Sequence, residues 1–219
     1  MALFRGAADR VKGTVARALR DEVAANLDER FHEMLEEAVF LWEQDGWTSH
    51  DGAEVDCTVQ IYRWCRHLTH NEERYVLMNI QIEWLLVTPA MFLGTEKVKG
   101  AKRPDLRLEV GKIGRAIECK RLAPTGGWIR SYVYEGLARF VVGDYAGEEP
   151  VGYMIGYVQS GHQPELLKSI NAQVDGHPLM GVPDELQFLE RGAKWSWSRS
   201  SHVRRSSSIY VDHCLIDVG

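Results

Sequence analysis

Two short runs of alternating apolar and polar residues, joined by Gly111-Lys112, constrain the fold more than any other feature of this chain. In the first run the apolar residues are Leu106, Leu108 and Val110, and in the second Ile117 and Cys119 alternate with Ala116, Glu118 and Lys120. A period of two is typical of strands with one buried face. Because Gly suits the first position of a two-residue type II′ turn, the sequence predicts a β-hairpin here.

The turn determines which residues face each other across this hairpin. A two-residue turn pairs Val110 with Ile113, and counting outward places Asp105 opposite Glu118. The Cβ atoms of such a pair lie about 4.5–5.5 Å apart, and Lys120 falls on the same face as Glu118 because side chains two apart on a strand point the same way. A four-residue loop, which the sequence leaves open, would instead pair Asp105 with Lys120. The charged cluster forms in either register.

The predicted cluster contains the groups that hold Mg²⁺ and hydrolyse a phosphodiester. Two adjacent carboxylates repel each other and resist ionisation unless a cation lies between them. Mg²⁺ prefers carboxylate and water oxygens and binds through one or two carboxylates together with substrate phosphate. We therefore expect Asp105 and Glu118 to bind the metal, with the backbone carbonyl of Cys119, whose side chain points into the core. Lys120 would assist the attacking water or balance charge on phosphorus.

A simpler interpretation is a solvated cross-strand ion pair, which contributes little to stability. Three observations argue against it. Glu118-Cys119-Lys120 is the one Asp/Glu-x-Lys triplet in the chain, and of two Pro-Asp pairs only Pro104-Asp105 leads into a hairpin ending in that triplet. The other pair, Pro183-Asp184, is interpreted as a helix start. The carboxylates also oppose each other once the register is imposed.

Pro104, Asp105, Glu118 and Lys120 resemble the signature of the PD-(D/E)xK nuclease superfamily. The resemblance implies an α/β fold, a mixed sheet flanked by helices with a restriction-endonuclease-like core. That core runs helix, three antiparallel strands, helix, strand. Around the hairpin, the sequence predicts the other core elements over residues 75–87 (strand), 129–142 (helix) and 151–158 (strand), so the resemblance covers roughly residues 75 to 160.

The superfamily resemblance also implies a further acidic residue from the first helix or strand and polar residues on the second helix. Glu83 is the first choice for the acid, and Glu36 and Glu37 on a helix are weaker choices. The polar residues expected on the second helix are Tyr134, Glu135 and Arg139. For all of these a structural role is favoured, since helices normally carry a polar face.

The first third of the chain is predicted to be helical. Apolar residues recur every four positions from Val11 to Val39, which predicts one long helix or two helices broken near residues 24–27. Asp56 is expected to cap a second helix that ends near Leu68. We expect residues 1–70 to form a helical region packed on a nuclease-like core of residues 71–219, together making one structural unit.

Charge is distributed unevenly along the chain. Residues 21–56 contain twelve acidic residues and one basic residue, a net charge of −11, whereas residues 97–121 contain nine basic and three acidic residues, a net charge of +6. Residues 191–205 contain five basic and no acidic residues, with Trp195 and Trp197 among them. Basic and aromatic side chains suit nucleic-acid binding, although a solvated positive face is favoured for the last segment taken alone. The acidic helices are expected to face away from nucleic acid and to mediate a homodimer or bind a partner protein.

Cysteine and histidine residues provide no metal-binding pattern. The cysteines Cys57, Cys65, Cys119 and Cys214 lack the spacing of a zinc site and favour buried, reduced thiols. His202 and His213 are interpreted as scattered polar residues, with His202 beside Arg204 and Arg205 as a possible phosphate contact. No apolar run approaches the ~20 residues of a membrane span, and we expect a cytoplasmic protein.

The sequence therefore predicts a metal-dependent nuclease that uses Mg²⁺, for which Mn²⁺ can substitute. By family analogy the substrate is DNA rather than RNA, and a DNA endonuclease of a microbial restriction, anti-phage or mobile-element system fits such a chain. Two rival hypotheses remain. One is a catalytically silent nucleic-acid-binding module of the same fold, and the other is a regulatory or structural subunit of a larger complex.

Overall fold

A seven-stranded mixed sheet forms the centre of the protein. The computed structural model describes residues 5–46, 53–82, 103–205 and 207–219. In these residues the strand order is β1-β2-β3-β4-β7-β6-β5. The strands span Asn79–Ile82 (β1), Leu106–Val110 (β2), Ile113–Leu122 (β3), Val151–Val158 (β4), Gln187–Arg191 (β5), Trp195–Val203 (β6) and Ser208–Asp217 (β7). The sheet combines parallel and antiparallel pairs, so the mixed α/β class expected from the sequence is confirmed.

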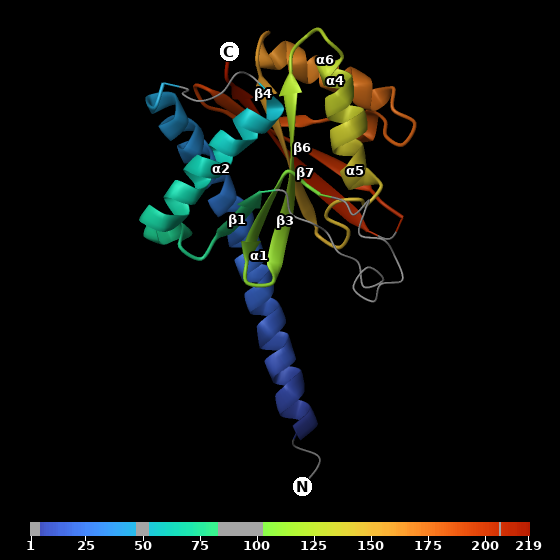
Figure 1. Ribbon diagram of the computed structural model, residues 1–219. Helices are drawn as coiled ribbons and strands as arrows, with labels where there is room; N and C mark the ends of the chain where they lie inside the picture. The colour runs from blue at the N-terminus through green and yellow to red at the C-terminus, as the bar shows by residue number, and fades with distance from the viewer. Residues whose placement is uncertain (1–4, 47–52, 83–102, 206) are drawn as a thin grey trace, which may run out of the picture.

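Helices cover both faces of this sheet (Figure 1). One face carries α1 (Arg5–Gln44) and α2 (Glu54–Asn71), followed by the short 3₁₀ turn η1 (Glu73–Tyr75). The opposite face carries α4 (Trp128–Ser131), the π-helical η2 (Tyr132–Leu137), α5 (Ala138–Val141) and α6 (Gln163–Asp175). A second 3₁₀ turn, η3 (Val182–Asp184), precedes β5. The first helix is a single continuous element, and its N-terminal half extends away from the rest of the molecule (Figure 1).

The hairpin β2–β3 has the register of the two-residue turn. Val110 pairs with Ile113 and Leu106 with Ile117, which places Asp105, the residue before β2, opposite Glu118. Gly111 adopts φ +59°, the left-handed conformation that a type II′ turn requires at its first position. The four-residue loop is therefore excluded.

The middle of the sheet is parallel. Strand β3 pairs in parallel with β4, and β4 pairs in parallel with β7. Such strands are covered on both faces and are apolar along their length, as β4 is, with every residue from Gly152 to Val158 buried. Strands β6 and β5 then extend the sheet in antiparallel fashion beyond β7. Strands β5, β6 and β7 were not predicted from the sequence.

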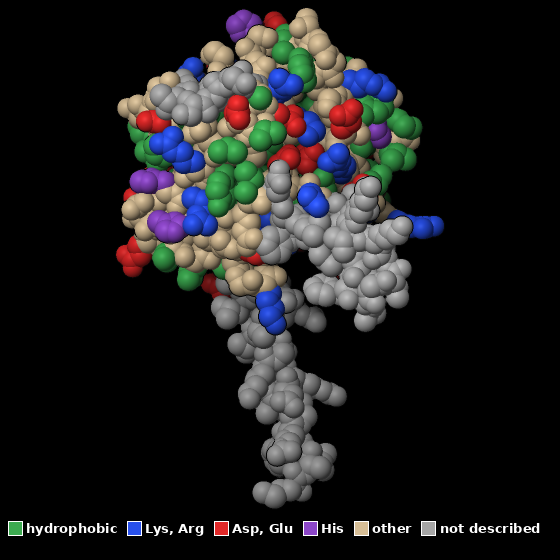
Figure 2. All heavy atoms as spheres, in the orientation of Figure 1, with side chains coloured by type: hydrophobic (Ala, Val, Ile, Leu, Met, Phe, Trp, Pro, Cys, Tyr) green, Lys and Arg blue, Asp and Glu red, His purple; other side chains and the backbone are tan. Residues whose placement is uncertain are grey.

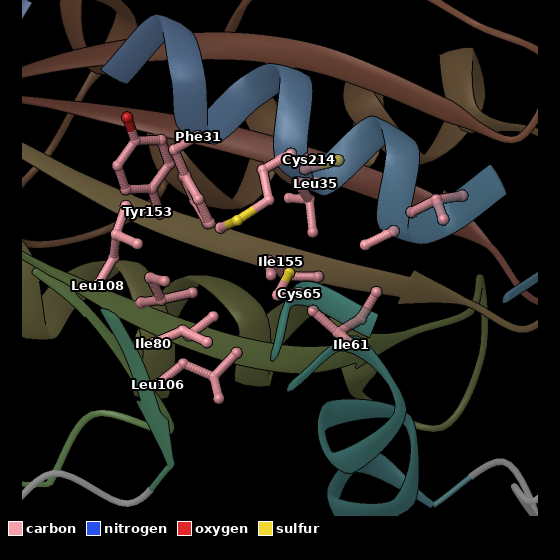
Figure 3. Packing of buried hydrophobic residues seen from close by; sticks show 14 of the residues in the cluster. Phe31, Leu35, Ile61, Cys65, Ile80, Leu106, Leu108, Tyr153, Ile155 and Cys214 are labelled. Atoms are coloured by element: carbon pink, nitrogen blue, oxygen red, sulfur yellow. The ribbon is translucent and has the colours of Figure 1, made fainter. Parts of the chain in front are cut away.

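A separate hydrophobic core lies on each face of the sheet. On the α1–α2 side, Phe31 and Leu35 of α1 point toward Ile155 and Cys214 on the sheet, and Cys65 of α2 joins them (Figure 3). On the other side, the residues that pack together come from η2, α5 and α6 and from the facing strand positions. Since α1, α2 and the sheet share one core, the N-terminal helices are packed on the strands. All four cysteines are buried and free.

Two details of the predicted elements are wrong. Tyr75 belongs to η1 and is fully buried, so the first described strand begins only at Asn79. Residues 83–87 of the predicted strand lie outside the described part of the chain. Helix α2 starts at Glu54 with Ala53 at its N-cap, which moves Asp56 from the predicted cap into the first turn. Pro183 and Asp184 lie in the short 3₁₀ helix η3, so the helix start predicted there is present as a 3₁₀ turn.

His202 and His213 are not scattered surface residues. Both are fully buried, and a chain of hydrogen bonds joins them through Ser200 Oγ, which lies 2.7 Å from His202 Nε2 and 2.8 Å from His213 Nε2. The chain continues from His202 to Asp184 and from His213 to the hydroxyl of Tyr132, each at 2.8 Å. Buried polar groups are stable only when hydrogen-bonded, so these histidines hold η2, η3, β6 and β7 together. His202 is therefore not available to a phosphate.

Candidate active site

The hairpin brings the two predicted carboxylates together beside the start of α2. The backbone N–H of Cys119 donates a hydrogen bond of 2.7 Å to Asp105 Oδ2, which fixes the Asp105 side chain against β3. Glu118 lies on β3 with a side chain that is only 1 % exposed. The side chain of Cys119 points to the opposite face and is fully buried, as the strand period predicts. Asp105, Glu118 and the Cys119 backbone therefore occupy one site.

The ammonium group of Lys120 lies among the acidic groups of this site. Its Nζ is 2.8 Å from Glu118 Oε1 and 3.1 Å from Glu54 Oε1. It also donates a hydrogen bond of 2.9 Å to the carbonyl oxygen of Cys119. An ammonium group has three donors, so these three acceptors account for all of them. Lys120 acts in this arrangement as the internal counter-ion of the cluster.

Glu54 is a residue of the candidate site that the sequence did not predict. It is the first residue of α2, and its second carboxylate oxygen accepts a 3.1 Å hydrogen bond from the backbone N–H of Arg121. Together with Asp105 it lines a small cavity of about 40 Å³. The signal for it was an acidic residue in the first turn of the helix that precedes the strands. That signal was obscured because the helix was expected to start at Asp56.

Arg139 and Tyr145 connect the two carboxylate-bearing segments. The guanidinium of Arg139 in α5 donates to Glu118 Oε1 at 3.1 Å and also to the hydroxyl of Tyr145. The Tyr145 hydroxyl in turn donates to the carbonyl oxygen of Arg103 at 2.9 Å, two residues before Asp105. A single cation on the helix side thus orients Glu118 and the backbone that leads into Asp105.

Burial and mutual repulsion shift the titration of this cluster. Burial, followed by the nearby charge of Asp105, raises the pKa of Glu118 to about 7. Burial also raises the pKa of Asp105 above its ordinary value. Although burial opposes it, the charges of Glu118, Glu54 and Asp105 raise the pKa of Lys120. In this site Lys120 therefore stays protonated, next to the Glu118 carboxyl group, which ionises only near neutral pH.

One oxygen of this cluster supports a cation site. Glu118 Oε2 is buried and has no hydrogen-bond partner among the described residues. A buried carboxylate oxygen without a partner is costly, and a bound cation would satisfy it. The structure brings no three His, Cys, Asp or Glu side chains into a ready-made metal cluster within the ranges described above. Mg²⁺ does not require one, since one or two carboxylates with water and substrate oxygens suffice.

Two other acidic residues considered for the site, Glu36 and Glu37, have partners of their own. Glu36 accepts a hydrogen bond from the indole of Trp197 at 2.9 Å. Glu37 pairs with Arg74 and accepts from the hydroxyl of Tyr75. These side chains pack α1 against its neighbours, which agrees with the structural role that was favoured for them. Glu83 lies outside the described residues, and Glu135 on η2 is exposed and accepts from Ser131.

Part of the predicted basic surface is internal. Arg115 is 2 % exposed and forms a two-pronged pair with Asp28, at 2.8 and 2.9 Å. Arg107 pairs with Glu149 at 2.6 Å. Trp197, expected among surface residues that contact bases, is fully buried and stacks on His32. Some of the positive charge in these segments is therefore neutralised in internal ion pairs, one of which joins α1 to the strands.

Cations also lie on the segments that follow and precede the cluster in the chain, with Arg121 half-buried and Arg130 exposed. The guanidinium of Arg121 lies 4.0 Å above the ring of Trp128 at the start of α4, and that of Arg130 lies 4.0 Å above the ring of Tyr134. Arg103, just before Asp105, is exposed. Figure 2 shows acidic and basic side chains gathered near the centre of the face in view, over the region where β3 meets the start of α2. Acidic and cationic groups thus lie side by side on one accessible face.

Comparison of the chain with protein-family models, with curated proteins and with solved structures found no match. Among the described residues, no helix is both long enough and apolar enough to cross a membrane.

Proposed function

We propose that the protein is a Mg²⁺-dependent nuclease that hydrolyses phosphodiester bonds, with DNA as the favoured substrate. The observation that carries the proposal is the partnerless Oε2 of Glu118 beside Asp105 and Lys120. The order of elements α2, β1, β2, β3, a helix and β4, with β3 parallel to β4, supports a restriction-endonuclease-like core and the resemblance to PD-(D/E)xK nucleases.

The metal would be held by Asp105, Glu118 and the carbonyl of Cys119, with Glu54 close by. When bound, Mg²⁺ polarises a phosphate and lowers the pKa of a bound water. The residues of the chain supply the rest. Lys120 would place a positive charge where hydroxide forms and where charge develops on the phosphate oxygens, and Arg139 would hold Glu118 in position through its 3.1 Å hydrogen bond.

The proposed substrate follows from the groups around the cluster. Arg121 and Arg130 each stack on an aromatic ring and place planar cations around α4. Such groups bind phosphates through their charge and stack on unpaired bases. DNA is favoured over RNA by family analogy alone. A restriction, anti-phage or mobile-element role in a microbe is the biological setting that we propose.

The test is cleavage by the purified full chain. Plasmid, linear and single-stranded DNA and RNA are incubated with Mg²⁺, Mn²⁺ or EDTA, beside Asp105→Asn and Lys120→Met. The exposed Lys112 of the hairpin turn provides the matched control, Lys112→Ala. We expect metal-dependent cutting that both site variants lose and the control retains. Cutting that persists in the site variants would refute the assignment.

A catalytically silent nucleic-acid-binding module is the second possibility, and one observation favours it. All three donors of Lys120 are already used by Glu118, Glu54 and the Cys119 carbonyl, which leaves none for a water molecule in this arrangement. Calorimetric titration with Mn²⁺ separates the two functions. A nuclease site binds the ion in competition with Lys120, whereas a silent site shows no binding.

A further inference from the structure

A pocket lies between α6 and the edge strand β5. It has a volume of about 380 Å³, within the range of small-molecule sites, which span about 300–1,000 Å³. The first turns of α6 form one wall, and β5, the outermost strand at this edge of the sheet, forms the other. The hairpin β2–β3 lies toward the opposite edge, so a ligand in this pocket would be independent of the proposed active site.

The accessible lining of this pocket is almost wholly apolar. Pro164 and Leu167 line it from α6, and Phe188 lines it from β5. The Phe188 side chain is 56 % exposed, and that of its neighbour Leu189 is 48 % exposed. Apolar residues that gather in the open around a cavity are typical of a surface that binds a ligand. The interior of the pocket therefore suits an apolar group.

The charged residues that border the pocket are positive. Lys168 and Arg191 both border it and are exposed, and neither forms an ion pair within the described part of the chain. Such long side chains lay an apolar stem along a cavity and keep the charged end in water. Glu190 does not neutralise them on this face, because it lies opposite Trp197, whose side chain packs in the core on the α1 side. The rim therefore suits an anionic group.

We propose that this pocket binds a free fatty acid, with its hydrocarbon chain against the apolar walls and its carboxylate at Lys168 and Arg191. A nucleotide or a peptide would bring polar groups into a pocket that offers them almost no hydrogen-bond partner, and such burial is costly. A peptide strand is further disfavoured by the irregular pairing of β5, which has a bulge between Phe188 and Glu190. Bulges protect an edge strand from the addition of another strand. A hydrocarbon chain needs no hydrogen-bond partner.

The experiment is calorimetric titration of the full chain with hexanoate, octanoate and decanoate, each below the concentration at which it forms micelles. Octanol carries the same chain as octanoate without the charge, and the octyltrimethylammonium ion carries the opposite charge. Vesicles of phosphatidylglycerol present the same chemistry from a membrane surface. Phe188→Ser removes an exposed part of the wall, and Leu179→Ser, at a side chain that is 58 % exposed outside this pocket, is its matched control. Lys168→Ala and Arg191→Ala remove the rim cations, and Lys112→Ala, at the exposed hairpin turn, is the control for both.

We expect saturable binding of the fatty acids, with a dissociation constant that falls about fourfold for each added methylene group. Lys168→Ala and Arg191→Ala should each raise the dissociation constant of octanoate about threefold and leave that of octanol unchanged. Phe188→Ser should raise both dissociation constants about tenfold, and the control variants should change neither.

Several results would overturn the fatty-acid site. It is refuted if no fatty acid binds saturably, if the affinity does not depend on chain length, or if the octyltrimethylammonium ion binds as tightly as octanoate. Binding of the vesicles without binding of the free acids would also refute it, as would an equal loss of octanoate binding in Leu179→Ser and Phe188→Ser.

Discussion

Replacing the charge of Glu118 should stabilise the metal-free protein at alkaline pH. The variant Glu118→Gln keeps an oxygen that accepts from Lys120 and Arg139, at 2.8 and 3.1 Å in the parent. It also replaces Oε2, which has no partner among the described residues, by an amide nitrogen. What it removes is the buried negative charge beside Asp105.

The sign of the effect follows from the pKa of Glu118, which is about 7 in the folded protein and 4.5 for the free side chain. An acid whose folded pKa is raised binds its proton more tightly in the folded state, so the folded state is favoured at low pH. The free-energy cost of holding Glu118 ionised in the folded state appears as the pH rises through 4.5 and is complete above 7. Each unit corresponds to about 1.4 kcal/mol, which gives about 3 kcal/mol as an upper value.

The loss of the ion pair between Glu118 and Lys120 reduces this gain. Lys120 keeps Glu54 as a partner at 3.1 Å, so we expect Glu118→Gln to raise the free energy of unfolding by about 1–3 kcal/mol at pH 8. At pH 5 the parent carboxyl group is protonated, and the two proteins should differ little. The quantity to compare is the unfolding free energy of the variant minus that of the parent. If this difference is smaller at pH 8 than at pH 5, the reasoning is refuted.

The assay is urea unfolding in EDTA at both pH values, followed by tryptophan fluorescence. Glu109→Gln is the matched control because Glu109 lies on the same hairpin and is partly exposed, with a pair to Arg107. Its effect should stay within about 0.5 kcal/mol at either pH. A control that responds like Glu118→Gln would point to the net charge of the protein and not to burial of Glu118.

Three further predictions concern other parts of the molecule. Lys120→Met should tighten Mn²⁺ binding, measured by calorimetry, because the competing ammonium is gone. It should also abolish cleavage. Weaker Mn²⁺ binding would contradict the role of Lys120 as counter-ion. Burial lowers the pKa of His213 to about 3, so the folded state loses stability as the pH falls below the ordinary value of about 6.5, by about 2 kcal/mol at pH 5. His213→Gln should remove this dependence in urea unfolding, and an unchanged pH profile would contradict it. Gly152→Ala should lower the free energy of unfolding by about 1–3 kcal/mol, since a Cβ would collide with the ring of Phe140; an unchanged urea midpoint would show that the ring can move aside.

The hairpin and its register could be predicted because they depend on local rules. The side-chain period and the turn at Gly111 fix which residue opposes which, and the structure follows them from Leu106 to Ile117. The central strand β4 was equally predictable from its apolar run, with the same bounds, Val151–Val158. These features involve residues close together in the chain, where one period and one turn decide the outcome.

Contacts between distant segments could not be predicted in this way. Glu54 reaches Lys120 only because α2 packs against the sheet, and Asp28 pairs with Arg115 for the same reason. The count of basic residues could not show that Arg115 would be internal. Strand β6 was missed because it carries many serines, although Ser196, Ser198 and Ser200 are all buried. Tertiary packing overrides such local patterns.

A destabilising feature of the fold and the proposed chemistry involve the same side chain, Glu118. Glu118 is nearly inaccessible, lies beside a like charge and leaves one oxygen unsatisfied. Lys120 and Arg139 compensate only one side of the carboxylate, so the arrangement retains an unfavourable charge that a cation would neutralise. A ligand that binds only the folded state at a hundred times its dissociation constant adds about 2.7 kcal/mol of stability. If a divalent cation is that ligand, it should stabilise the parent and not Glu118→Gln, so that the substitution that stabilises the metal-free protein also removes its response to the metal.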